Sequence, residues 1–398
     1  MSRSALPSCP PVPARRTSQD FPTLQLKMAV ATPMFGGGVS PGQIDASLPI
    51  RVSSIRGHLR FWWRATCGAE FNSVNKLREE EAKVWGCSEQ RSAVETCVSI
   101  STEGPGIAYP PNALKYVLFP FTHDGWRDIE FTLDLRYPAS LREQVETALR
   151  AWVNFGGIGA RTRRGCGALY CGDFALRTVD EVRDAFRWNA TCHGWPVLGD
   201  FQIGGRQRTP MDSWQHAVGI MKEFRQGEYG RNWIGSVPHL SRWPEADSLR
   251  RITGKFLDPG HRPSPNGPCA FPRAELGLPI QFQFKHRDDK ANNCELLPVD
   301  DRGAALTRMA SPIILRPLVV AARQAFAMLV TLNTPGVTAA RFKTTHKDRD
   351  PDPSPLLNGR DVTASEIRNT AAASQPGFPL AGSASALAAF LSYARSEL

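Results

Sequence analysis

The sequence predicts an α+β fold with antiparallel sheets, and a ferredoxin-like arrangement in its first half. Two observations support this fold class. Some segments alternate apolar and polar residues, as half-buried strands do, and others repeat apolar residues every three or four positions, as amphipathic helices do. Within residues 21–190 these segments run strand, helix, strands, helix, strand. This is the ferredoxin-like order with an extra short helix in the first crossover.

The elements of the first half follow one another at short intervals. The clearest strand is "IEFTLDLRY", whose apolar residues alternate with polar ones. The clearest helix is "LREQVETALRAWVNF", which ends at a Gly-Gly pair. Strands are predicted over residues 23–34, 93–101, 115–121, 129–137 and 168–176, and helices over 53–64, 77–85 and 141–155.

The second half is predicted to form a separate domain. Residues 187–210 are rich in Gly, Pro and Trp and are interpreted as the junction. Beyond it we predict a helix starting at Thr209, strands over 278–285 and 308–320, and a helix over 384–394. The predicted division is a disordered tail over residues 1–20, a first domain over 21–190 and a second domain over 200–398.

Positive charge is concentrated in three windows of the chain. The protein has 398 residues, a net charge of +10 and a pI near 9.3, which suggests an acidic partner such as nucleic acid. Residues 51–64, 156–172 and 341–349 together account for the whole excess. Evenly spread charge would favour solubility, whereas clustered charge favours a binding surface for a polyanion.

Cysteine and histidine spacing argues against a disulfide framework or a zinc site. The nine cysteines include no Cys-x-x-Cys pair, and the eight histidines show no ligand spacing. Reduced thiols and a cytoplasmic location are expected, with no metal and no cofactor. Residues 1–20 lack the apolar core of a signal peptide. The longest apolar stretch is interrupted by Arg316, Pro317 and Arg323, so no membrane span is predicted.

The helix that contains "SSIRGHLRFWW" carries two different stripes. Apolar residues recur at spacings of four and three on one face, and arginines recur every four residues on another. A solvated basic face is the simplest interpretation. However, no acid lies in the window, and aromatic and guanidinium groups stack on nucleic-acid bases. The residues predicted to contact RNA here are Arg56, His58, Arg60, Trp63 and Arg64.

A second candidate is the loop "GGIGARTRRGCG", residues 156–167, in which glycines and arginines alternate. It lacks the Gly-Lys-Ser/Thr of a phosphate-binding loop, and it follows a helix instead of a strand, so nucleotide binding of that type is excluded. A flexible surface loop remains the alternative to an RNA-backbone-binding loop. The predicted RNA-binding residues are Gly157, Gly159, Arg161, Arg163, Arg164 and Gly165, with Lys343 from the third basic window.

Catalysis has little support in the sequence. There is no Ser-His-Asp signature and no paired carboxylates at metal-binding spacing. An RNA endonuclease would have to use His58 or His346 as a general acid, or Asp45 as a metal ligand. No catalytic residue is therefore assigned. A protein that only assembles with acidic partner surfaces remains a further alternative.

Six motifs together resemble a known family. They are "ATPMFGGG", "SSIRGHLRFWWRA", "KVWG", "GGIGARTRRGCGAL", "FPRAELGLPIQF" and "RMASPIILRPL". This combination is similar to the RAMP superfamily, and within it to the first subunits of Cmr, or type III-B, CRISPR effector complexes. The motifs span about three quarters of the chain, and the pairing of the basic helix with the glycine-arginine loop is the most specific part.

The resemblance implies two tandem ferredoxin-like, RRM-related domains and a non-catalytic role in antiviral defence. It implies that the basic helix and the glycine-rich loop bind guide RNA near its 3′ region and help engage single-stranded target RNA. Other Cmr-type subunits and no membrane would be the remaining partners. The second half lacks a comparable glycine-arginine loop and ends on a helix, so the alternative for it is docking to other subunits.

Overall fold

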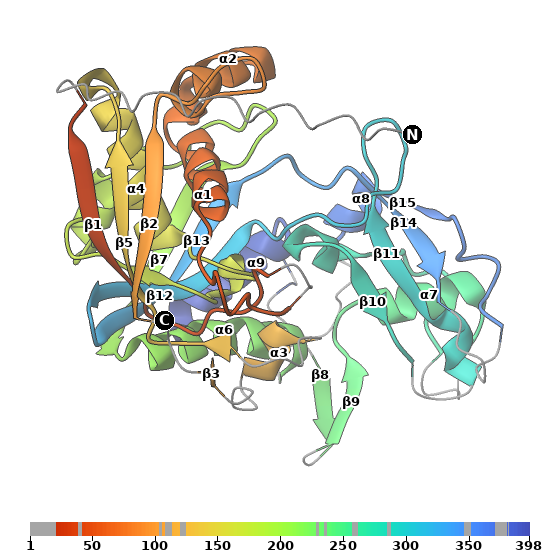
Figure 1. Ribbon diagram of the computed structural model, residues 1–398. Helices are drawn as coiled ribbons and strands as arrows, with labels where there is room; N and C mark the ends of the chain where they lie inside the picture. Colours follow the sequence, from red (N-terminus) through yellow and green to blue (C-terminus); the bar gives the residue numbers. More distant parts are fainter. Residues whose placement is uncertain are drawn as a thin grey trace, which may run out of the picture.

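The computed structural model describes most of the chain as two sheets and two helix layers that stack on one another, with a further four-stranded sheet and two two-stranded sheets (Figure 1). The predicted tail, residues 1–20, lies outside the described residues. None of the helices in the described part is long and apolar enough to cross a membrane. The described residues are 21–38, 42–102, 106–107, 114–119, 125–227, 231–234, 237–256, 262–284, 288–345, 352–370, 380 and 382–398.

The first sheet has the strand order and pairing of a ferredoxin-like domain. Its four strands lie in the order β2-β5-β1-β6, and every neighbouring pair is antiparallel. Helices α1 and α2 connect β1 to β2, and α4 connects β5 to β6, so the predicted order of elements is confirmed. The elements are β1 (Thr23–Val30), α1 (Val52–Ala65), α2 (Val74–Trp85), β2 (Glu95–Thr102), β5 (Glu130–Arg136), α4 (Arg142–Phe155) and β6 (Leu169–Tyr170).

One predicted strand of the first half is wrong. Residues 115–121 were expected to be extended, but α3 (Lys115–Leu118) is a short helix. Val117 and Leu118 pack in a small apolar cluster with Phe35 and Trp214. A short apolar run fits a buried helical turn as well as a strand, so periodicity alone cannot separate the two. The neighbouring strands β3 (Gly106–Ile107) and β4 (Gly125–Trp126) pair with each other, and α5 (Val179–Asp184) follows β6.

The second sheet repeats the ferredoxin-like order with three strands. Its antiparallel order is β12-β13-β7, so no fourth strand borders β7 in the described part of the chain. Half of residues 187–210, which were interpreted as a junction, form strand β7, which the sequence analysis did not predict. Glycines obscure the strand pattern there, and a Cβ at Gly199 would lie 2.7 Å from Asn333 Oδ1. The elements are β7 (Val197–Arg208), α6 (Pro210–Gln226), β12 (Ile313–Ala321), β13 (Gln324–Asn333) and α9 (Ala386–Glu397).

The two ferredoxin-like units share one core. Helices α1 and α4 lie between the first sheet and the second, and α6 and α9 cover the other face of the second sheet (Figure 1). Strand β12 is consequently buried along almost its whole length. The buried side chain of Arg316 on β12 donates to the carbonyls of Val153 (3.1 Å) and Gly156 at the end of α4. The division at residues 190–200 stays a prediction, since the core runs across it.

A third, four-stranded sheet is inserted into the second unit. Its antiparallel order is β10-β11-β14-β15, and it lies beside the layered core (Figure 1). Its first two strands precede β12 and its last two follow β13. The elements are β8 (Arg231–Ile234), β9 (Val237–Ser241), α7 (Glu245–Thr253), β10 (Ile280–Phe282), β11 (Cys294–Pro298), β14 (Ala339–Thr344), β15 (Asp361–Thr363) and α8 (Ala364–Arg368).

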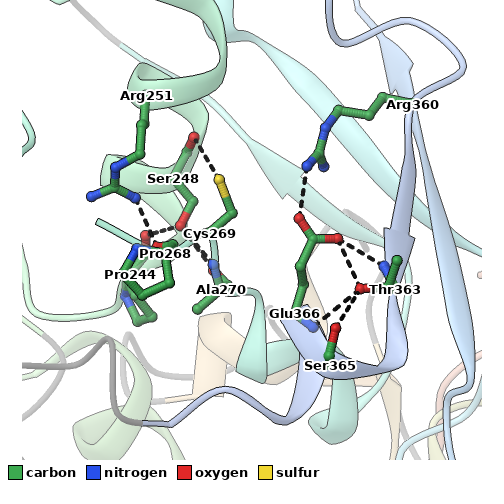
Figure 2. Close-up of polar contacts among 10 residues, drawn as sticks. All are labelled: Pro244, Ser248, Arg251, Pro268, Cys269, Ala270, Arg360, Thr363, Ser365 and Glu366. Atoms are coloured by element: carbon green, nitrogen blue, oxygen red, sulfur yellow. Dashed lines mark hydrogen bonds and ion pairs between the residues drawn. The ribbon is translucent and has the colours of Figure 1, made fainter. Parts of the chain in front are cut away.

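Local polar contacts stabilise the helices α7 and α8 that accompany this sheet, as Figure 2 shows. The buried Ser248 hydroxyl on α7 donates to Pro244 O (2.7 Å) and accepts from Ala270 N (2.9 Å). Thr363 and Glu366 form a capping box at the start of α8. Arg360 donates to the Glu366 carboxylate at 2.7 Å. These polar groups are occupied by contacts within the inserted sheet and its helices.

Candidate nucleic-acid interface

Helix α1 presents both stripes that its sequence predicts. Ile55, Leu59 and Trp62 are buried in the shared core, so the apolar face is confirmed. The arginines at positions 56, 60 and 64 lie on the opposite side and are half-buried. The helix therefore holds three guanidinium groups in one row along its open side.

The arginine row is paired, contrary to the sequence interpretation. Glu81 on α2 accepts from Arg60 Nε and Arg64 Nη1, both at 2.7 Å, through the same oxygen. The Glu81 side chain is only 5% exposed, against 35% and 34% for the two arginines. One nearly buried carboxylate thus orients two cations, whose remaining N–H groups can face a ligand. Arg56 makes a different contact and donates to Trp85 O at 3.2 Å.

Trp63 cannot stack on a base in this structure, so that prediction is wrong. Its side chain is 1% exposed, and its indole Nε1 donates to Gln144 on α4 at 3.0 Å. The helix turns Trp63 toward α4 because its buried face is wider than a single stripe. His58 is half-buried, and its ring stacks on Trp152 of α4 with centroids 6.2 Å apart. The side chains of Trp63 and His58 thus pack between α1 and α4.

The burial of His58 predicts a pH-dependent stability. Desolvation lowers the pKa of His58 to about 4, so the ring is neutral in the folded protein at pH 5, whereas the unfolded chain takes up a proton below about 6.5. Acid therefore favours unfolding. Relative to a His58→Phe variant, the wild type should lose about 2 kcal/mol of stability between pH 7 and pH 5. Urea unfolding of both proteins at the two pH values measures this difference, and an equal loss in both would contradict it.

The glycine-arginine loop packs against the loop that follows β1, and it is not a flexible surface segment. Ile158 N donates to Gly167 O (2.9 Å), which closes the loop on itself. Ala160 N donates to Phe35 O (2.6 Å), and Gly167 N donates to Pro33 O (2.9 Å). The alternative of a loose loop is therefore wrong. The segment around "FGGG" supports the loop, and both are anchored on the first sheet.

The glycines of this loop are required by the protein itself. Gly157 and Gly165 are buried, and a Cβ at Gly157 would lie 2.8 Å from Gly167 O. Gly159 has a φ of +84°, and its Cβ would lie 2.7 Å from Phe35 O. Close approach of chain to chain thus explains these glycines. The prediction that Gly157 and Gly165 contact RNA is wrong, because both residues are buried within the protein.

Two of the three arginines of the loop make side-chain hydrogen bonds within the protein. Arg161 donates to the carbonyls of Val117 and Phe119, each at 2.5 Å. Arg163 donates to Ser311 O at 2.7 Å, and its guanidinium lies 5.4 Å from the centroid of the Phe61 ring on α1. The two basic motifs therefore meet at this cation–π contact.

Arg164 differs from its neighbours because it has an orphaned donor. Its Nη1 is buried and has no hydrogen-bond partner. The hydroxyl of Tyr116 is likewise buried without a partner. Desolvation, and to a lesser degree nearby Arg225 and Arg161, lower the pKa of Arg164. Replacing Arg163 or Arg164 would disturb buried contacts, so these positions are poor probes of RNA binding.

The described part of the third basic window lies on the inserted sheet, whereas the arginine row lies on helix α1. Lys343 is exposed on β14, opposite Glu295 on β11. Arg341 is held by Asp361 through two contacts, of 2.6 and 3.2 Å. Residues 346–349, which include His346, lie outside the described residues. The structure does not bring Lys343 together with α1.

A cleft beside α1 contains basic residues that the sequence analysis missed. It has a volume of about 1220 Å³ and is lined by Arg56 and Arg60, and also by Arg91 and Arg136. Arg91 lies in the loop after α2, and Arg136 is the last residue of β5. Neither belongs to a basic window, so no pattern in the sequence marks them. Only the pairing of β5 with β2 and the crossover of α1 bring the four together.

The residues named for the nuclease alternative have other contacts. One oxygen of Asp45 accepts from Ser47 N (3.0 Å), Ser47 Oγ (2.7 Å) and Leu48 N (3.3 Å). These bonds lower the pKa of Asp45 and form a local turn. No group of three or more His, Cys, Asp or Glu side chains suited to a metal occurs within the described ranges.

Comparison with known proteins identifies the class of the first half. The RAMP superfamily matches residues 27–170, which contain the first sheet, α1, α4 and the glycine-arginine loop. Over these residues the chain is similar to the RAMP superfamily, which confirms the resemblance stated from the motifs over this range. A curated relative is the CRISPR system Cmr subunit Cmr1-1 of Pyrococcus furiosus, 28% identical over 167 residues. The match covers 35% of this chain and 48% of that protein, so it spans about half the relative's length.

Two solved structures show weaker likeness. The crystal structure of apo Cmr1 from Pyrococcus furiosus matches with 15% sequence identity and a TM-score of 0.46. This match covers 87% of this chain and 95% of that chain. A chain of the cryo-EM structure of the type III-B Cmr-beta complex bound to cognate target RNA is 10% identical. The match covers 79% of this chain and 95% of that chain, with a TM-score of 0.46. Scores of this size are no basis for assigning function.

Proposed function

We propose that this protein is a non-catalytic RNA-binding subunit of a type III-B CRISPR ribonucleoprotein effector. In this proposal it holds the 3′ region of the guide RNA, helps engage single-stranded target RNA and acts in cytoplasmic antiviral defence together with other Cmr-type subunits. One observation carries the proposal. The arginine row of α1 lies within the RAMP-superfamily region, and two of its members line a cleft with two further arginines.

The chemistry of this surface suits phosphate groups. Guanidinium groups present planar sets of donors that match phosphate oxygens, and several of them along one face can follow a polyanion. Glu81 orients Arg60 and Arg64, which reduces the side-chain freedom that binding would otherwise remove. The name of the curated relative, a Cmr subunit of a CRISPR system, supports the same class of function.

Two alternatives remain as outcomes of the test. A RAMP-type endoribonuclease that processes guide precursors would need His58, His346 or Asp45. The low pKa of His58 and the local bonds of Asp45 favour binding over cleavage by these groups. A purely structural assembly subunit would bind its partners equally well without RNA.

The purified chain should bind labelled single-stranded RNA with an affinity that falls steeply with salt, and it should leave the RNA intact. Each phosphate contact adds about 0.7 to the slope of log affinity against log salt for a single strand. An Arg56→Gln variant should bind about tenfold more weakly, because it loses one charge-assisted contact.

Arg302→Gln is the matched control for this experiment. Arg302 is exposed after β11 of the inserted sheet and does not line the cleft, so its loss removes the same charge and affinity should be unchanged. Cut RNA would favour the nuclease. Absence of binding at low salt, with a folded protein, would overturn the proposed RNA-binding function.

A further inference from the structure

The cleft beside α1 is an electropositive groove. Four arginines line it, and Glu95 is the one acid among its lining residues. Glu95 lies 3.1 Å from Arg91, and these side chains are 56% and 82% exposed. Four arginines thus stand against two carboxylates, Glu95 and the Glu81 that pairs with Arg60, which leaves the groove with an excess of positive charge.

Two polar atoms in this groove are buried without a partner. They are Arg136 Nε and Thr96 Oγ1, and both residues line the cleft. Arg136 ends β5 and Thr96 follows the first residue of β2, so two paired strands hold them in place. Buried polar atoms are almost always hydrogen-bonded, so Arg136 and Thr96 keep unused hydrogen-bonding capacity beside the groove.

The shape and lining of the groove favour an extended anion that is not held by its bases. The volume of about 1220 Å³ exceeds the upper range of small-molecule pockets. No aromatic side chain lines the cleft, and stacking on aromatic side chains is how single-stranded bases are usually held. What the groove offers is guanidinium groups, a hydroxyl and loop backbone, which suit phosphate and ribose oxygens.

We propose that this cleft binds the sugar–phosphate backbone of a single-stranded RNA segment, without reading its bases, through Arg91 and Arg136 together with Arg56 and Arg60. The inference deepens the RNA-binding function proposed above and rests on it. Arg91 and Arg136 are the new assignments. They extend the contact surface from α1 across the loop after α2 to the end of the first sheet.

The test measures binding of the full chain to two labelled homopolymers of equal length, oligo(U) and oligo(A), across a salt series. Arg91→Gln and Arg136→Gln should each weaken binding about tenfold for both homopolymers. Each should also reduce the salt slope by about 0.7. Because Arg91 is 82% exposed, its replacement leaves the fold intact even if Arg136→Gln does not. Arg302→Gln again serves as the control of equal charge.

The outcomes separate this inference from the proposed function. If the wild type binds RNA but both cleft variants bind equally well, the cleft assignment is wrong and RNA binding elsewhere on the protein stands. If the variants weaken one homopolymer only, the cleft reads bases and the backbone assignment is wrong. If polyglutamate displaces RNA at equal charge concentration, the groove belongs to an acidic protein segment. If the wild type binds no RNA, the proposed function itself fails.

Discussion

Replacing Arg316 by methionine should lower the free energy of unfolding by about 3 kcal/mol. Methionine fills similar space but leaves the carbonyls of Val153 and Gly156 without their donor. These carbonyls lie in the last turn of α4 and at the residue that follows, where a helix cannot satisfy its own acceptors. Each buried acceptor left alone costs about 1–3 kcal/mol.

The opposing effect is relief of the buried charge of Arg316. Desolvation lowers the pKa of Arg316 to about 9, so removing the guanidinium recovers part of the cost of burying it. The loss should still dominate, because Arg316 also donates to Pro317 O (2.9 Å) and lies near Leu169 O (3.5 Å), and these acceptors all remain.

Urea unfolding at pH 7 measures this change. Arg323→Met is the matched control, since Arg323 is exposed in the turn of the same β12–β13 hairpin and should change stability by under about 0.5 kcal/mol. A loss below about 1 kcal/mol for Arg316→Met would mean that these hydrogen bonds do not hold β12 to the end of α4 as described.

The second large effect is expected at Gly165 in the glycine-arginine loop. Gly165→Ala should lower the free energy of unfolding by about 2–4 kcal/mol, from left-handed backbone strain and overpacking. The φ of Gly165 is +82°, and a Cβ there would lie 2.6 Å from Leu315 O and press on the Trp214 ring. The indole of Trp214 would then lose its bond to Arg164 O.

Gly219→Ala provides a control of opposite sign. Gly219 lies inside α6 with no atom within 4 Å of its added Cβ, so alanine should stabilise the protein by about 0.5–1 kcal/mol. Thermal unfolding of the two variants beside the wild type measures both changes. Equal stability of Gly165→Ala and wild type would show that the loop can move away from α6 and β12.

The first ferredoxin-like unit could be predicted from the sequence because its signals are local. Alternation in β5 and the apolar stripe of α1 follow directly from the geometry of a strand and of a helix. The second unit was harder to recognise. Glycines obscure the pattern of β7. Two strands of the inserted sheet also separate α6 from β12, and two more separate β13 from α9, so neighbouring elements in space are distant in the chain.

The candidate site also has features that the sequence predicts and features that it does not. The arginine row of α1 is visible in the sequence because its four-residue spacing places it on one face. The burial of Trp63 against α4 is not visible, since a residue beside an apolar stripe turns inward or outward according to what packs there. The partner of Arg60 and Arg64 is likewise hidden, because Glu81 comes from another helix.

By itself, the sequence determined the class of fold in the first half, the RAMP resemblance and the basic character of α1. These depend on the order and spacing of residues within single elements. The tertiary structure alone decided that glycines of the loop pack against the protein, that Arg316 joins β12 to the end of α4, and that Arg91 and Arg136 complete a groove. Those features arise from contacts between segments far apart in the chain, and side-chain periodicity carries no information about which segments meet.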